Sequence, residues 1–189
     1  DLKAGGVEAK ALTNVDPTRG QAELTFKNAK AEPLGATGEG WSILTQVLDR
    51  AAVLLAFDQV GGSDRALEMG RDYALDRIAF GRPIGSFQAL KHRAANMFVE
   101  VELSRSIVLD ALRAIDEGRA DLPQLASVAK ARVSDAIHLI GNEAVQMFGG
   151  IGVTDEEEIG LFLKRARVAE LTLGDAAYHR ARFAALSGF

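Results

Sequence analysis

The alternation of apolar and polar residues changes once along the chain. Val7–Ala11 and Ala22–Phe26 alternate with a period of two, which is typical of half-buried β-strands, and Ala29–Glu32 repeats the pattern briefly. From about residue 41 onward, apolar residues recur at three- and four-residue spacing, which predicts helices. We therefore expect a few strands followed by a long helical region.

Five helices are expected from this periodicity and from the capping signals at the helix ends. Their expected spans are about 42–78, 86–116, 121–148, a shorter helix opened by the capping box Thr154–Glu157, and 175–186. Asp121 is the expected N-cap of the third helix, whereas Gly81 and Pro83 are expected to end the first. Gly61–Gly62 lies inside the first helix and indicates a kink or a close contact with another helix.

The strands and helices divide the chain into two expected parts. Two or three strands are too few to form a stable sheet, so we interpret residues 1–36 as the end of a truncated β domain. Three long helices with short links predict an antiparallel, up-down bundle over residues 37–189. The expected fold class is therefore mainly α. The sequence opens at Asp1 without a methionine, which we interpret as a fragment of a longer polypeptide.

Composition excludes several classes of function. The net charge of −4 gives no reason to expect nucleic-acid binding, and the absence of cysteine excludes disulfides and thiolate nucleophiles. His92, His138 and His179 have no second ligand at metal-binding spacing, so no metal site is expected; His92 fits a basic helix face and the other two fit solvated positions. No apolar run approaches the ~18 residues that a membrane span needs, and no signal peptide is visible. We therefore expect a cytoplasmic protein without a membrane partner.

The most unusual stretch is Arg77–Gln88, RIAFGRPIGSFQ, between the first two long helices. A turn between helices needs no arginine and only one glycine. Arg77 and Arg82 supply positive charge, while Gly81 and Gly85 allow backbone N–H groups to approach a ligand beside the next helix N-terminus. The pattern fits an anion site, but it also fits an ordinary helix end with surface arginines.

A second glycine-rich cluster, Gln146–Gly152 (QMFGGIG), follows the third long helix. Its three glycines, Gly149, Gly150 and Gly152, are more than one helix C-cap requires. They suit a backbone that lies close against a flat or bulky ligand. A helix ending followed by a loop explains the cluster about equally well.

In this order, the motifs R-x-x-F-G-R-P-I-x-x-F-Q and Q-x-F-G-G-x-G resemble those of the C-terminal helical domain of acyl-CoA dehydrogenases, over essentially the whole chain. The resemblance implies a tetrameric flavoprotein that oxidises an acyl-CoA thioester to the enoyl-CoA, with an electron-transfer flavoprotein as acceptor. A carboxylate takes the α-proton while a hydride passes from the β-carbon to FAD. The FAD-binding positions that it implies are Arg77, Phe80, Gln88, Gln146, Gly149 and Gly150.

The catalytic positions of that family do not match. Its usual base, a glutamate directly before a glycine in the final turn, aligns with Leu173, and an alternative base position on the first helix aligns with Ala51. Asp49, typical beside the second position, is retained as a weak substrate-side candidate, whereas Ala79 and Asp175 replace hydroxyl residues. Leucine and alanine cannot accept a proton, so the rate enhancement of typically ~10²–10⁴-fold from general-base catalysis is missing.

The retained residues would serve a partner's FAD, and the lost residues would serve the chain's own. This favours a subunit of an α2β2 acyl-CoA dehydrogenase, of the kind that acts on fatty-acid or steroid side-chain thioesters, completed by a homologous subunit. One alternative is a self-sufficient homotetramer with a base outside this region, or at Asp49 or Asp175. Two others are a non-catalytic helical scaffold and a different flavin reaction on the same fold.

Overall fold

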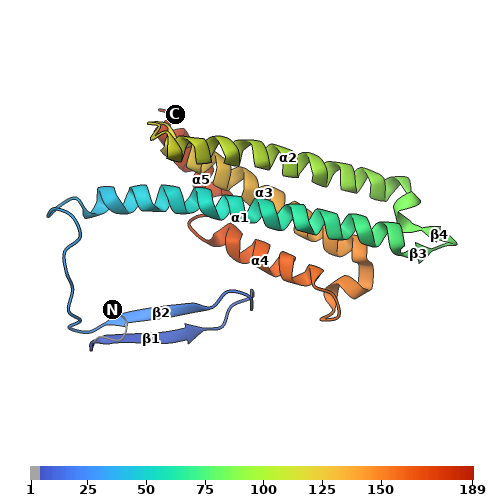
Figure 1. Cartoon of the computed structure of the whole chain (residues 1–189), viewed down its shortest axis with the longest axis horizontal. Helices are drawn as coiled ribbons and strands as arrows, with labels where there is room; N and C mark the ends of the chain where they lie inside the picture. Colours follow the sequence, from blue (N-terminus) through green and yellow to red (C-terminus); the bar gives the residue numbers. More distant parts are fainter. Residues whose placement is uncertain (1–4) are drawn as a thin grey trace.

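The computed structural model describes residues 5–189 and contains a helical bundle with a β-hairpin beside it (Figure 1). The elements in chain order are β1 (Val7–Leu12), β2 (Gln21–Phe26), α1 (Gly40–Asp76), β3 (Ile78–Ala79), β4 (Arg82–Pro83), the 3-10 helix η1 (Ile84–Ser86), α2 (Gln88–Asp116), α3 (Leu122–Phe148), the 3-10 helix η2 (Gly149–Val153), α4 (Ile159–Leu171) and α5 (Ala176–Leu186). The predicted fold class, mainly α with a few preceding strands, is confirmed.

β1 and β2 form a two-stranded antiparallel hairpin in which Val7 lies opposite Phe26 and Leu12 lies opposite Gln21. Ala29–Glu32 was expected to continue the strand pattern, but that expectation is wrong: the segment is irregular and leads towards α1. A strand needs a neighbour for its backbone N–H and C=O groups, and within residues 5–189 none lies beside it.

The loop between β1 and β2 is attached to the bundle by two ion pairs. Arg165 Nε of α4 donates to Asp16 Oδ2 at 2.9 Å, and Arg19 Nη2 lies 2.9 Å from Asp58 Oδ2 of α1. Burial of the Asp16 carboxyl opposes its ionisation, but hydrogen bonds from Thr18 and Arg165 outweigh that effect and lower its pKa. The hairpin is therefore held to the helices through its loop.

The bundle core surrounds α3, which packs against α1, α2, α4 and α5. Its buried side chains form two apolar clusters, one toward each end of the three long helices. Members of the first are Val53, Val60, Val108, Ala126 and Val133, and members of the second are Met97, Val101, Ile140, Met147 and Phe148. Many core positions are alanine, so the helices approach closely.

Three predicted helix signals have different outcomes. α1 is continuous through Gly61–Gly62, and a Cβ on Gly62 would lie 3.7 Å from Ile137 Cδ1, so the close helix contact that was one of the two expectations lies at Gly62. The prediction of a capping box at Thr154–Glu157 is wrong. The Thr154 hydroxyl donates to Ile151 O at 2.7 Å and closes η2, and α4 begins later, at Ile159. Asp121 stands at the N-cap of α3, but its carboxylate pairs with Arg119 and not with a helix N–H group.

The expectation that no stretch could cross a membrane is wrong for α1. By length and composition alone, α1 is long and apolar enough to span one, because part of its sequence holds few charges and apolar residues such as Leu54 and Phe57 also lie on its exposed face. A core helix of a water-soluble bundle passes the same test, so this finding is weak evidence for a membrane.

Candidate functional site

The Arg77–Gln88 stretch forms a tight hairpin at one end of the bundle (Figure 1). β3 and β4 pair with Ala79 opposite Arg82, which leaves Phe80 and Gly81 as a two-residue tip. Both tip residues have positive φ, +54° and +76°, as a type I′ turn requires. Gly81 and Pro83 therefore build this hairpin; they do not cap α1, which already ends at Asp76.

The hairpin presents charge and an aromatic ring to its surroundings. The Phe80 side chain is 93% exposed, and its ring meets the Phe87 ring edge-on at 6.1 Å between centroids. The Arg82 guanidinium lies 4.2 Å from the centroid of Phe87. Arg77 is exposed, and among residues 5–189 its guanidinium takes part in no ion pair. Arg77 therefore keeps its donors available to a ligand from outside the chain.

Gly85 is required by the close approach of η1 to the end of α1. A Cβ at this position would lie 2.9 Å from Ala74 O, closer than real Cβ contacts allow. We expect Gly85→Ala to lower the free energy of unfolding by about 1–3 kcal/mol, because the backbone must shift to relieve the clash. Urea denaturation followed by circular dichroism measures the change.

The matched control for Gly85 is Gly61→Ala in the middle of α1. No atom lies within 4 Å of a Cβ at Gly61, so alanine there should stabilise the protein by about 0.4–1 kcal/mol through helix propensity and unfolded-state entropy. If both substitutions changed stability in the same direction, the close approach at Gly85 would not be the cause.

The second motif forms the end of α3 and the 3-10 helix η2. Gly149 ends α3 with φ +66°, and a Cβ on Gly152 would lie 2.8 Å from Phe148 Cβ. Gly150 meets neither condition: its φ is not positive, and no atom lies within 4 Å of a Cβ built there. Gln146, Gly149 and Gly150 are all exposed, so this stretch offers open backbone and one free amide side chain.

The two motifs lie at the same end of the bundle. Tyr73 of α1 stacks on Phe148 of α3 with ring centroids 4.2 Å apart, and this pair links the end of α1 to the end of α3. Within the described part of the chain, no hydrogen bond joins Arg77 or Gln88 to Gln146; the Gln88 amide Nε2 contacts His92 Nε2 at 3.1 Å. The predicted cofactor residues therefore lie in two exposed patches at this end of the bundle.

This set of groups fits an anionic ligand that also carries flat rings. A guanidinium, exposed amides and open glycine backbone are donors for phosphate oxygens, and an exposed phenylalanine ring offers a surface for packing. No heavy atom lies within 4 Å of a Cβ built at Gly81, Gly149 or Gly150, so these positions leave room for such a ligand. The residues present therefore fit a dinucleotide presented to this surface from outside.

A separate cavity of about 450 Å³ lies between α1, the α4–α5 turn and α5. Its lining residues are Trp41, Thr45, Leu48, Asp49, Ala52, Leu173, Gly174, Tyr178, His179 and Arg182. It contains the base position predicted at Leu173 and the predicted substrate-side residue Asp49. Ala51 does not line it, although the next residue does.

Both carboxylates near this cavity are already engaged. Asp49 Oδ1 lies 2.7 Å from Arg182 Nη2, and the two side chains are only 7% and 19% exposed. Asp175 Oδ1 accepts a hydrogen bond from Tyr178 N at 2.8 Å and caps α5. Among residues 5–189, no unpaired carboxylate therefore lines this cavity.

Sequence reasoning missed Lys130, which is fully buried in α3. Its Nζ donates to Ser134 Oγ at 3.0 Å, to Glu170 O at 3.0 Å and to Gly174 O at 2.9 Å. Burial lowers the pKa of Lys130 to about 8. The available signal was its position on the α3 face that also carries Ser127 and Ser134, both buried.

His179 was expected in a solvated position, and that expectation is wrong. The residue is 3% exposed, and its Nε2 lies 3.0 Å from Leu173 O in the turn between α4 and α5. Burial is the main reason that its pKa is lowered, which favours the neutral imidazole. Because a carbonyl oxygen only accepts hydrogen bonds, Nε2 carries the proton.

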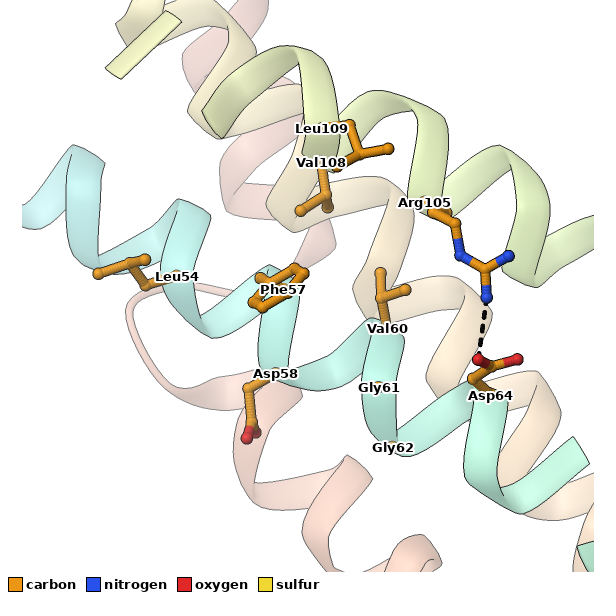
Figure 2. Close-up of a pocket in the computed structure, with 10 residues that line it drawn as sticks. All are labelled: Leu54, Phe57, Asp58, Val60, Gly61, Gly62, Asp64, Arg105, Val108 and Leu109. Carbon is orange, nitrogen blue, oxygen red and sulfur yellow. Dashed lines mark hydrogen bonds and ion pairs between the residues drawn. The ribbon is translucent and has the colours of Figure 1, made fainter. Parts of the chain in front are cut away.

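Figure 2 shows a third feature, a largely apolar groove of about 550 Å³ between α1 and α2. Its residues are Leu54, Phe57, Asp58, Val60, Gly61, Gly62, Asp64, Arg105, Val108 and Leu109. Arg105 Nη2 and Asp64 Oδ2 meet across it at 2.9 Å. None of the site residues predicted from the sequence lines this groove.

Comparison with known proteins gives a consistent result. Residues 38–186 match the family described as acyl-CoA dehydrogenase, C-terminal domain. The chain is 39% identical to acyl-CoA dehydrogenase IpdE2 of Mycobacterium tuberculosis over 158 residues, which are 84% of this chain and 45% of that protein. It is 30% identical to the short-chain specific acyl-CoA dehydrogenase of Megasphaera elsdenii over 155 residues, which are 80% of this chain and 40% of that protein.

Solved structures show the same likeness. The butyryl-CoA dehydrogenase of Megasphaera elsdenii superposes with a TM-score of 0.94 at 26% identity, over 99% of this chain and 50% of that one. A variant of the Tcur3481-Tcur3483 steroid ACAD superposes with a TM-score of 0.90 at 28% identity, over 100% of this chain and 50% of that one. The chain thus spans about half the length of the proteins that it matches.

Proposed function

Because the chain belongs to the acyl-CoA dehydrogenase family, as its motifs predicted, we propose that it is a subunit of an FAD-dependent acyl-CoA dehydrogenase that has no base of its own. It completes the FAD site of a homologous partner subunit within a tetramer. The substrate of the complex is an acyl-CoA thioester with a fatty-acid or steroid side chain, and the acceptor is an electron-transfer flavoprotein. The complex acts in the cytoplasm.

One observation supports the proposal that this chain has no catalytic base. The cavity that contains the family's base position has Leu173 there, and the two nearby carboxylates, Asp49 and Asp175, are held by Arg182 and by the N-terminus of α5. These contacts hold both carboxylates to other parts of this chain and not to the space inside the cavity. The cavity can hold an apolar chain, but it offers no free group for the α-proton.

The exposed patches at the other end of the bundle support the role toward FAD. When bound, FAD supplies the acceptor for the two electrons removed from the acyl chain. The Arg77 guanidinium would bind its pyrophosphate oxygens, and the Gly149–Gly150 backbone would lie against it without a steric barrier. Phe80 would cover a ring of the cofactor, and the Gln88 and Gln146 amides would orient it.

Two relatives support the acyl-CoA substrate class. The proteins similar to this chain include a short-chain specific acyl-CoA dehydrogenase and a steroid ACAD, so thioesters of both kinds fit the family. In this chain, Trp41, Leu48 and Leu173 give the cavity apolar walls that would pack against an acyl chain and exclude water.

We expect the full-length protein, expressed alone, to hold little FAD and to show no turnover of acyl-CoA. Co-expression with a homologous acyl-CoA dehydrogenase subunit should give a flavin-containing heterotetramer that reduces an artificial electron acceptor. Flavin absorbance and single-turnover bleaching measure occupancy and activity in each preparation, and the partner expressed alone is the control.

Two results would contradict this proposal in different ways. Full FAD occupancy with turnover in the protein alone would support a self-sufficient homotetramer. A heterotetramer that retains FAD but never turns over would support a scaffold of this fold. The proposed function and these two alternatives each predict a different combination of FAD occupancy and acyl-CoA turnover rate.

A further inference from the structure

The turn between α4 and α5, residues 171–175, is held by buried groups from other parts of the chain. Lys130 Nζ, on α3, donates to the carbonyl before the turn, Glu170 O, and to the carbonyl inside it, Gly174 O, at 3.0 and 2.9 Å. Across the turn itself, Gly174 N and Leu171 O are 3.4 Å apart. A single ammonium group therefore joins the two sides of the turn.

The backbone of this turn is in an unusual conformation. Leu173 has φ +63°, a region that costs a leucine roughly 1–2 kcal/mol. Gly174 follows with φ +101°, and a Cβ there would lie 2.4 Å from Tyr178 Cδ1. Such a conformation persists only where surrounding contacts determine it.

His179 and Asp175 fix the same turn from the side of α5. His179 Nε2 donates to Leu173 O at 3.0 Å, and Asp175 caps α5 through Tyr178 N. The carbonyls of Glu170, Leu173 and Gly174 are thus bound by side chains of α3 and α5. These contacts lie on both sides of residue 173 along the chain, and they fix the backbone that carries its side chain.

We propose that Lys130 is a positioning residue that clamps the α4–α5 turn, so that the side chain of residue 173 faces the acyl cavity whatever that side chain is. The base position has then lost its carboxylate by one side-chain replacement, while the frame that would present it is kept. The clamp itself does not depend on FAD; its consequence for catalysis rests on the proposed function.

The charge of Lys130 makes this clamp sensitive to pH. Burial lowers its pKa to about 8, while the charges of Glu170 on α4 and Asp175 before α5 act in the opposite direction. His179 and Arg182 on α5, and Asp49 on α1, are the other ionisable groups around it. At pH 7 the ammonium serves all three acceptors, whereas the neutral amine formed above pH 8 has only two N–H donors and no charge.

Amide hydrogen exchange of the full-length protein tests the clamp. Lys130→Met should lower the protection of amides 171–175 about tenfold or more, since the turn then opens locally. Lys91→Met, at an exposed lysine of α2, should leave it unchanged. In the wild type, protection of the same amides, corrected for intrinsic exchange, should fall about tenfold between pH 7 and pH 9, as expected for a group with this pKa. In Lys130→Met no such step should appear.

The core amides 97–108 serve as the internal reference, because their protection should not change with Lys130. If Lys130→Met also lowered their protection, the variant would be globally unfolded and the wild-type pH step would decide. Equal protection of the turn in both proteins, or a wild type without the pH step, overturns the clamp.

A second measurement tests the consequence for residue 173. Leu173→Glu should keep the protection of amides 171–175 at the wild-type level, and adding Lys130→Met should lower it about tenfold or more. If Leu173→Glu alone removed this protection, the turn would depend on the side chain at residue 173, and the claim that the frame is kept whatever that side chain is would be overturned. Neither measurement uses FAD or turnover, so failure of the clamp and failure of the proposed function are distinguished.

Discussion

Replacing Asp49 by alanine is expected to lower the free energy of unfolding by about 3 kcal/mol. Asp49 and Arg182 join α1 to α5 at 2.7 Å, and both side chains are largely buried. Removing the carboxylate leaves the Arg182 guanidinium without its partner in a largely buried place, where water substitutes poorly for the lost carboxylate. The loss should lie at the low end of the ~3–5 kcal/mol range for broken buried pairs, because Arg182 still donates to Pro123 O and Ser127 Oγ.

Asp64→Ala is the matched control for this prediction. Asp64 also lies on α1 and pairs with an arginine, Arg105, at 2.9 Å, but these two side chains are 45% and 39% exposed (Figure 2). Pairs of this kind contribute about 0.2–1 kcal/mol, so the control should lose far less stability. Urea unfolding of the full-length variants gives both values.

The double variant Asp49→Ala/Arg182→Met separates the two sources of the loss. If the uncompensated guanidinium is the cause, removing it as well should recover part of the stability lost in Asp49→Ala. A double variant less stable than both single variants would contradict this explanation. Similar losses in Asp49→Ala and Asp64→Ala would show that burial of the Asp49 pair contributes nothing.

The helices and the end of the bundle that carries the motifs could be predicted from the sequence. The period of apolar positions over long segments determines which face is buried, and α1, α2 and α3 follow it closely. The tight hairpin at Phe80–Gly81 could not be found this way, because strands of two residues show no period. The role of Thr154 could not be found from the sequence either. Its hydroxyl donates to Ile151 O and closes η2, whereas the sequence pattern predicted that it would open α4.

The buried lysine shows a different limit. A single charged residue on a helix is interpreted as exposed, because burying a charge without partners is costly. Lys130 is buried because Glu170 O and Gly174 O satisfy it, and these acceptors lie 40 and 44 residues away in sequence. Only the packing of α4 and α5 against α3 brings them together. The same packing buries His179 against the turn.

The proposed cofactor residues could be predicted only in part. The order of their motifs located them at one end of the bundle, but the chain alone forms exposed patches there. A cavity around Arg77 and Gln146 requires surface that residues 5–189 do not supply within their own contacts. Under the proposed function the site forms only in an assembly, so its energetics must be measured in one.

In that assembly, Arg77→Ala should weaken retention of FAD by about 1.5–3 kcal/mol, or roughly 10- to 150-fold in the dissociation constant. The Arg77 guanidinium is exposed and takes part in no ion pair among residues 5–189, so it has no intramolecular partner to give up when a phosphate binds. A hydrogen bond between a guanidinium and a phosphate is charge-assisted and often bidentate, which is why its loss should exceed that of a neutral contact.

Flavin titration of the apo-complex, followed by fluorescence quenching, measures this dissociation constant. Arg113→Ala is the control, because Arg113 is also exposed but lies near the far end of α2 and should change retention by less than about twofold. Arg77→Lys should recover only part of the affinity, since an ammonium group keeps the charge but loses the planar fork. If Arg77→Ala retained FAD as tightly as Arg113→Ala, the hairpin would not be part of the partner's FAD site, and the role proposed for this subunit would lose its structural basis.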